Sequence, residues 1–243
     1  MIMTDKTKAT IEAMKPFAFE GDEFTWLKQV AITGGCTYVT DGRAAVKVTL
    51  DEDVPDDMPD KFPLKSLNGI FDDAKSKANL FFKMTRDGFS AYIGAYKTDY
   101  NRWVAEERSN RRQWKRSLEK ATCPCCGEPV YIDGDELLTE DDVDKAIEEN
   151  PITPDMHEWN AKIRLGAEEG NAGFFQFRFI NNLLALSPEW RVGGVDRNVD
   201  GTIQMLYGET PDGKMQFVVM SLRCDAPYDE GRVKAVIECK EFE

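Results

Sequence analysis

The sequence contains few of the residue patterns on which enzymes commonly depend. Its only histidine is His157, which lies between Met156 and Glu158 in a segment bounded by prolines. A single histidine in such a loop is more often a surface residue than a general base. The chain also lacks a G-x-S-x-G nucleophile motif, a complete phosphate-binding loop and an H-E-x-x-H zinc motif. We therefore expect a protein that is not an enzyme.

Long apolar runs are absent, and so is a disulfide framework. No stretch approaches the ~20 apolar residues that a membrane-spanning helix needs. The first residues lack the apolar stretch of a secretory signal, so we expect a cytoplasmic protein. Cysteines in such a protein are expected to be reduced. There are six of them: Cys36, Cys123, Cys125, Cys126, Cys224 and Cys239.

Positive charge is scarce except in one segment. The chain has 31 Lys and Arg residues against 44 Asp and Glu residues, which gives a formal net charge of −13. Such a surface does not attract nucleic acid as a whole, because phosphate binding needs a basic footprint. Between residues 102 and 120, however, basic residues outnumber acidic ones. The basic residues of this segment are Arg102, Arg108, Arg111, Arg112, Lys115, Arg116 and Lys120.

The basic segment has the spacing of a helix with two distinct faces. At 3.6 residues per turn, five of its basic side chains fall within an arc of about 140°. Trp114 and Leu118 lie on another face, which suits packing. A solvated charged helix and a surface that binds nucleic acid both fit this pattern. The five basic residues are Arg108, Arg111, Arg112, Lys115 and Arg116.

The pattern of apolar and turn residues predicts an α+β fold. Asp41-Gly42 suits a two-residue hairpin turn between two strands. Helices and strands recur in a second round, so we expect two copies of one α+β unit. We place two domains at 1–100 and 101–243, with an inserted cysteine-containing segment at about 121–160. Helices are predicted over 7–19, 62–77, 102–120 and 139–150, a strand running into a helix over 174–188, and further strands over 24–33, 36–40, 46–50, 79–84, 89–98, 189–195, 201–209 and 215–223.

Several segments resemble the bacterial DNA polymerase β sliding clamp. YVTDGRAAVKV at 38–48 resembles the clamp segment ATDGHRLA, and FPLKSLNGIFDD at 62–73 resembles its IPRKAL helix start. DGFSAYIGAYKT at 87–98 stands where the clamp has a strand pair. FRFINNLLALSPEWRVGG at 177–194 is similar to a helix and strand of the last clamp domain, and FVVMSLR at 217–223 to its closing YVVMPMRL strand. These segments follow the clamp's order and cover about two thirds of the chain.

The resemblance implies the DNA clamp fold and a processivity factor for DNA polymerase. Clamp domains place helices on the inner face of a ring and antiparallel sheets outside, and duplex DNA passes through the hole without base readout. Six domains close the ring, so a chain with two clamp-type domains would form a homotrimer. The basic segment from Arg102 to Lys120 would then bind DNA. The compact size suits a clamp of a phage or mobile element.

The resemblance also implies a hydrophobic pocket that binds short peptides of the polymerase and the clamp loader. In the family this pocket borders the closing strand, where a methionine can repack around several partners. About half of the side chains of such a strand belong to the core instead. Ser221 stands where the clamp has a proline. The pocket residues carried over are Val218, Met220, Ser221, Leu222 and Arg223.

A C-P-x-C-G sequence inside the inserted segment forms half of a zinc site. Cys123 and Cys126 have the spacing of a zinc knuckle, but a structural site needs four ligands. Reduced cysteines without metal are the alternative. A zinc-ribbon nucleic-acid adaptor is therefore a rival to the clamp interpretation, and an acidic protein that mimics DNA is another. The residues available to complete the zinc site are Cys125, His157, Cys224 and Cys239.

Overall fold

The chain folds into two compact units. The first combines Met1–Ile93 with Trp159–Glu243, and the second is Gly94–Glu158. None of the helices among the described residues combines the length and apolar character that crossing a membrane requires. The structure is a computed structural model that describes residues 3–19, 21, 23–134, 136–149, 152, 158–166, 171–196, 202–222 and 233–239.

The first unit contains one motif twice, a helix followed by three antiparallel strands. The first copy comprises α1 (Asp5–Met14), β1 (Ala31–Thr33), β2 (Cys36–Thr40) and β3 (Ala44–Thr49). The second copy comprises α5 (Phe177–Leu186), β10 (Glu189–Asp196), β11 (Ile203–Glu209) and β12 (Met215–Met220). The repeated unit that the sequence predicts is therefore present.

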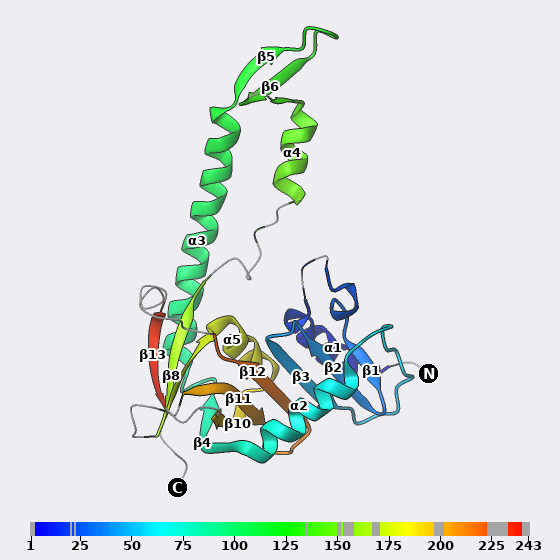
Figure 1. Ribbon diagram of the computed structural model, residues 1–243, viewed down its shortest axis with the longest axis vertical. Coiled ribbons are helices and arrows are strands. Elements are labelled where there is room, and N and C mark those ends of the chain that lie inside the picture. The colour runs from blue at the N-terminus through cyan, green and yellow to red at the C-terminus, as the bar shows by residue number, and fades with distance from the viewer. Residues whose placement is uncertain are drawn as a thin grey trace. The chain divides into compact units, whose positions relative to one another are not determined.

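The two copies share a single seven-stranded sheet, in the order β1-β2-β3-β12-β11-β10-β4 (Figure 1). The last strand of each copy pairs with the other, so that β3 and β12 run antiparallel with Val46 opposite Phe217. The order of strands is therefore symmetric about this pair, apart from β4 (Ala78–Thr85), which is added beside β10. One continuous sheet joins residues from both ends of the sequence.

One face of the sheet is covered by α2 (Leu64–Lys77). Its apolar residues recur at helical spacing, and Leu67 and Phe71 are buried in a cluster with Tyr38 of β2 and Val218 of β12. This cluster draws on both copies of the motif. Its burial therefore stabilises the junction between β3 and β12 as well as the helix itself.

The opposite face of the sheet is covered by α1 and α5, which contact each other. Thr37 precedes Tyr38 on β2 and so points away from α2, and its hydroxyl donates to the sulfur of Met14 on α1 at 3.0 Å. Phe17, in the short 3₁₀ helix that follows α1, stacks with Phe179 of α5 at 6.4 Å between ring centroids. The two helices thus form one layer on the same side of the sheet.

A smaller three-stranded sheet in the order β13-β8-β9 completes the first unit. β8 (Asn160–Leu165) is antiparallel to β9 (Ala172–Gln176), which leads directly into α5, and parallel to β13 (Val233–Cys239). We predicted only a charged tail in the region of β13. The strand was missed because its inward residues, such as Ile237, alternate with Lys and Glu over a short span.

The second unit consists of a helix, a small sheet and a second helix. α3 (Ser90–Ser117) enters it at Gly94 and is followed by β5 (Glu119–Thr122), β6 (Pro129–Asp133), β7 (Glu136–Leu138) and α4 (Glu140–Glu149). The three strands form an antiparallel sheet in sequence order. A separate apolar cluster holds these elements together, formed by Leu118, Tyr131 and Val143 with Trp114, Leu138 and Ile147 packed against it.

Much of the predicted secondary structure is confirmed. The α+β class with antiparallel sheets is correct, as are the helices that became α2 and α4 and the strand that runs into α5. A hairpin turn is present, with Gly42 at φ 88°, where L residues are strained and glycine is not. It is longer than the predicted two residues, because β2 ends at Thr40 and β3 begins at Ala44. Trp114 and Leu118 pack, as their place on the helix indicated.

Two strand predictions are wrong. Residues 89–98 begin α3 instead of forming a strand, and the resemblance to a clamp strand pair fails there. The aromatic residues suggested a strand, but they stack along the helix, as Tyr96 and Tyr100 do at 6.3 Å. Over residues 24–33, only Ala31–Thr33 is a strand, because Thr25–Leu27 forms a 3₁₀ turn.

The predicted domain boundary does not coincide with the division of the structure. Residue 100 lies inside α3, and the strands assigned to domains 1–100 and 101–243 pair in one sheet through β3 and β12. The inserted segment at about 121–160 does fall largely within the second unit, Gly94–Glu158.

Candidate functional site

The predicted DNA-binding residues lie on one helix and the strand after it. All those from Arg102 to Arg116 belong to α3, and Lys120 lies on β5. The side chains of Arg108, Arg112 and Arg116 are exposed. They are four residues apart, so they form a stripe with a rise of about 6 Å from one to the next. Within the described residues, none of the three takes part in an ion pair.

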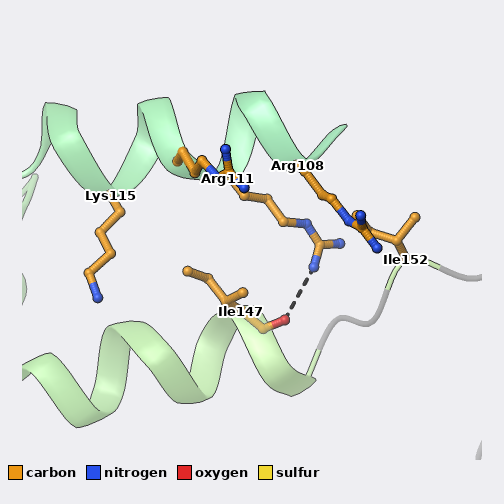
Figure 2. A pocket seen from close by; sticks show the side chains of 6 residues that line it. Arg108, Arg111, Lys115, Ile147 and Ile152 are labelled. Atoms are coloured by element: carbon orange, nitrogen blue, oxygen red, sulfur yellow. Dashed lines mark hydrogen bonds between the residues drawn. The ribbon is translucent and has the colours of Figure 1, made fainter. Parts of the chain in front are cut away.

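Two other cations of the segment connect α3 to α4. Arg111 is half-buried, and its guanidinium donates to Glu107 at 3.3 Å. It also donates to the carbonyl of Ile147 at 3.2 Å, as Figure 2 shows. The Nζ of Lys115 lies 2.6 Å from Asp144 and 3.5 Å from Glu140. The hydrogen bond to Asp144 raises the pKa of Lys115. These two side chains therefore have partners inside the unit.

The remaining two predicted cations differ from the stripe. Arg102 forms a short ion pair with Asp99 one turn earlier on α3. Lys120 lies over the ring of Tyr131, with its Nζ 5.5 Å from the ring centroid, in a cation–π contact. Of the seven predicted residues, Arg108, Arg112 and Arg116 are thus the best placed to bind an external anion.

Two shallow cavities flank the stripe. The first has a volume of about 400 Å³ and combines basic side chains of α3 with two isoleucines, as Figure 2 shows. The second, of about 360 Å³, shares Arg112 and Lys115 with it and extends toward β6. The residues that line the two cavities are Arg108, Arg111, Arg112, Lys115, Arg116, Lys120, Tyr131, Ile147 and Ile152.

The predicted peptide-pocket residues are divided between core and surface. Val218 is only 4% exposed and packs in the cluster under α2. Met220 is exposed, while Ser221 and Leu222 are half-buried. The amide of Ser221 donates to the carbonyl of Gln204, and the amide of Leu222 donates to the carbonyl of Phe174. Arg223 lies outside the described residues. The role of Met220, Ser221 and Leu222 in binding a peptide stays a prediction.

A buried ion pair joins the two copies of the motif, and sequence reasoning missed it. Asp41, in the hairpin turn, accepts hydrogen bonds from the amides of Arg43 and Ala44 with one carboxylate oxygen, both at 2.8 Å. Its other oxygen accepts from the guanidinium of Arg178 on α5 at 3.0 Å. Both side chains are less than 10% exposed. The signal in the sequence was an arginine between two phenylalanines, Phe177 and Phe179, in an otherwise apolar stretch.

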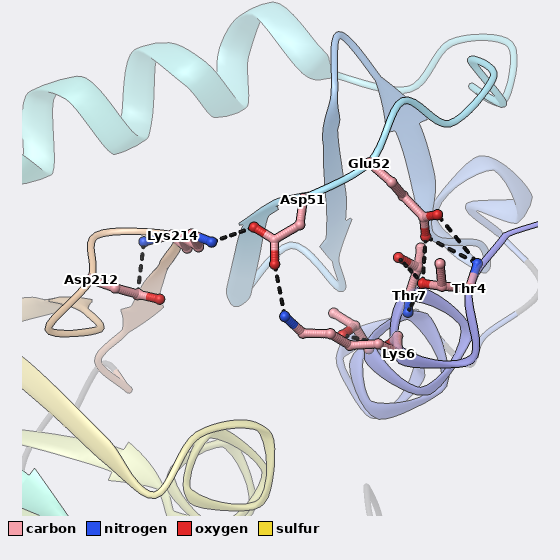
Figure 3. A network of polar contacts seen from close by, with 8 residues as sticks. Thr4, Lys6, Thr7, Asp51, Glu52, Asp212 and Lys214 are labelled. Carbon is pink, nitrogen blue, oxygen red and sulfur yellow. Dashed lines mark hydrogen bonds and ion pairs between the residues drawn. The ribbon is translucent and has the colours of Figure 1, made fainter.

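A second polar network, at the surface, also connects the two copies. Asp51, after β3, accepts from Lys6 of α1 at 2.7 Å and from Lys214 in the turn before β12 (Figure 3). The hydrogen bond from Lys214, followed by that from Lys6, lowers the pKa of Asp51 to about 2. Nearby, Glu52 accepts from the backbone and hydroxyl of Thr4, which caps α1.

Three of the predicted metal ligands lie close together. Cys123, Cys125 and Cys126 occupy the turn between β5 and β6, and their sulfur atoms all lie within 4.8 Å of one another. Hydrogen bonding from Cys125, and from backbone amides, lowers the pKa of Cys123 to about 7. His157 and Cys224 lie outside the described residues. Cys239 is buried in β13 of the first unit.

Comparison with known proteins gives structural likenesses but no family. No protein-family model and no curated protein matches the chain. A DNA polymerase III beta chain from Streptococcus pneumoniae matches with 11% identity and a TM-score of 0.42, over 92% of this chain and 64% of that one. A DNA polymerase sliding clamp from Pseudomonas aeruginosa matches with 12% identity and a TM-score of 0.42, over 91% and 66%. A C. crescentus beta sliding clamp matches with 10% identity and a TM-score of 0.40, over 92% and 68%.

The chain thus spans about two thirds of the length of the clamps that it matches. The identities lie below 25% and the TM-scores below 0.5.

Proposed function

We propose that the protein is a sliding-clamp-like processivity factor that binds duplex DNA without reading its sequence and closes around it as a ring of identical chains. The observation that carries this proposal is the repeated motif of a helix and three strands. Its copies meet at β3 and β12, and α1 and α5 lie together on one face. Of the segments that resemble the sliding clamp, 38–48 and 177–194 lie within these two copies, and 217–223 includes the end of β12.

The charge distribution supports DNA binding at a local site. A chain with a net charge of −13 repels DNA over most of its surface. The stripe of Arg108, Arg112 and Arg116 offers cations that can contact successive phosphates. Contacts of this kind position a duplex and carry no sequence information. A ring that relies on them holds DNA by enclosing it and lets it slide.

The number of chains in the ring does not follow from a domain count. A trimer was expected from two separate domains per chain. The two copies of the motif instead lie in one sheet. We therefore propose a closed homo-oligomer without a fixed number of chains. We further propose that peptides of a polymerase and a clamp loader dock beside Met220, Ser221 and Leu222, where the exposed methionine offers apolar contact.

Retention on circular DNA tests this function. The protein is incubated with nicked circular plasmid, and free protein is removed by gel filtration. We expect the protein to elute with the circle and to be released when a restriction enzyme linearises the DNA, because a ring slides off free ends. Equal retention on circular and linear DNA, or no retention on either, would contradict the proposal. A plasmid cut before incubation is the matched control.

A further inference from the structure

We propose that Cys123, Cys125 and Cys126 together bind one Zn²⁺ ion, which goes beyond the proposed function. The three sulfur atoms lie within 4.8 Å of one another. Zinc–sulfur bonds of about 2.3 Å in a tetrahedral arrangement place sulfur atoms about 3.8 Å apart. Small rotations of the side chains are therefore sufficient to bring all three sulfurs onto one ion. The fourth coordination position is left to a ligand from outside this group.

The backbone of the turn already has the shape that such a site needs. The amide of Cys123 donates to the carbonyl of Glu128 at 2.8 Å, and the amide of Gly127 donates back to the carbonyl of Cys123 at 2.9 Å. Gly127 has φ 79°, a left-handed conformation that glycine adopts without strain. These contacts fold the chain back on itself within five residues, so that the three side chains converge before any metal arrives.

The strands below the turn fix its position. Thr122 pairs with Pro129 at the end of the β5–β6 hairpin. Further along the same strands, Tyr131 is buried in the apolar cluster with Leu118 and Val143. The turn is thus attached to a packed hairpin rather than to a free loop. A preformed arrangement of ligands loses less conformational entropy when it binds an ion.

The three cysteines have no packing role that would explain their presence. Cys125 and Cys126 are exposed, and Cys123 is half-buried. In contrast, Cys239 is buried and behaves as an ordinary apolar core residue. Thiolates are soft ligands that favour zinc among the abundant divalent ions. Three sulfur ligands gathered at the surface therefore point to a metal site.

Metal content and cobalt spectroscopy test the site with the full-length protein. The protein is stripped with a chelator under reducing conditions, reloaded with ZnCl₂, passed over a desalting column and analysed for zinc. We expect one zinc ion per chain. A parallel sample loaded with CoCl₂ should show the thiolate-to-cobalt charge-transfer band and the intense visible bands of a tetrahedral site. Absence of bound zinc, or one ion shared by two chains, would overturn the proposal.

Single substitutions identify the ligands. Cys123→Ser, Cys125→Ser and Cys126→Ser should each abolish stoichiometric zinc retention, because each removes one of the three thiolates that hold the ion. Cys36→Ser, at a half-buried thiol of β2 in the first unit, is the matched control and should bind zinc normally. Unchanged zinc retention in Cys123→Ser and Cys126→Ser would exclude the site. Retention on circular DNA is measured with the same variants, so a failure of the zinc site is distinguishable from a failure of the clamp function.

Discussion

Replacing Asp41 by alanine is expected to reduce the free energy of unfolding by about 3–5 kcal/mol, because it removes one member of a buried ion pair. The carboxylate of Asp41 lies 3.0 Å from the guanidinium of Arg178, and both side chains are less than 10% exposed. The substitution also removes the acceptor for two backbone amides of the hairpin turn. Urea unfolding followed by circular dichroism measures the decrease in stability.

Two further variants isolate the cause of this decrease. In the double variant Asp41→Ala with Arg178→Met, no charge is left buried, so the double variant should be more stable than Asp41→Ala alone. Asp51→Ala is the matched control, since it also removes an ion-paired aspartate that connects the two copies of the motif, but at an exposed position. Its effect should be much smaller. If Asp41→Ala and Asp51→Ala cost the same, the buried pair is not the link that we describe.

Replacing Arg108, Arg112 and Arg116 together by alanine is expected to weaken binding to a short linear duplex by about 10²- to 10³-fold at 50 mM salt. These are the exposed cations of the predicted DNA-binding segment on α3 that form no ion pair within the described part of the chain. Each arginine withdrawn from a phosphate should also reduce the slope of log affinity against log salt by about 0.9, so the slope should fall by about 3 for the triple variant. Fluorescence anisotropy at several salt concentrations measures both quantities.

The matched control removes the same charge from another helix. Lys65, Lys75 and Lys77 are exposed on α2, and their replacement by alanine should leave the salt slope unchanged. Two duplexes of unrelated sequence should bind equally well to the unaltered protein, because phosphates do not report sequence. Equal decreases in affinity for the two triple variants would show that net charge, rather than the stripe on α3, determines binding.

Local sequence patterns predicted the turns and helices whose structure depends mainly on neighbouring residues in the sequence. Asp41-Gly42 gives a hairpin turn almost regardless of its surroundings, and the spacing of Leu67 and Phe71 gives an amphipathic helix. Residues 89–98 were misread because aromatic and β-branched residues favour strands on average, whereas here Tyr96 and Tyr100 lie four positions apart, which allows their rings to stack along a helix. Which preference prevails depends on the whole length of α3.

The candidate sites depend on contacts between residues far apart in the sequence. Lys115 was correctly placed on the basic face of a helix, but only the folded unit shows that its ammonium group forms ion pairs with Asp144 and Glu140. Asp41 and Arg178 are separated by 137 positions, so no local pattern connects them. By contrast, Cys123 and Cys126 belong to one turn, and their short spacing was enough to predict that they converge.

The mass of the protein in solution tests the central claim most directly, because a ring cannot be closed by one chain of this size. Sedimentation equilibrium should give a single species at a whole-number multiple of the chain mass of 27.6 kDa, stable over a wide range of protein concentration. A species of 27.6 kDa at every concentration, with or without duplex DNA, would contradict the clamp proposal.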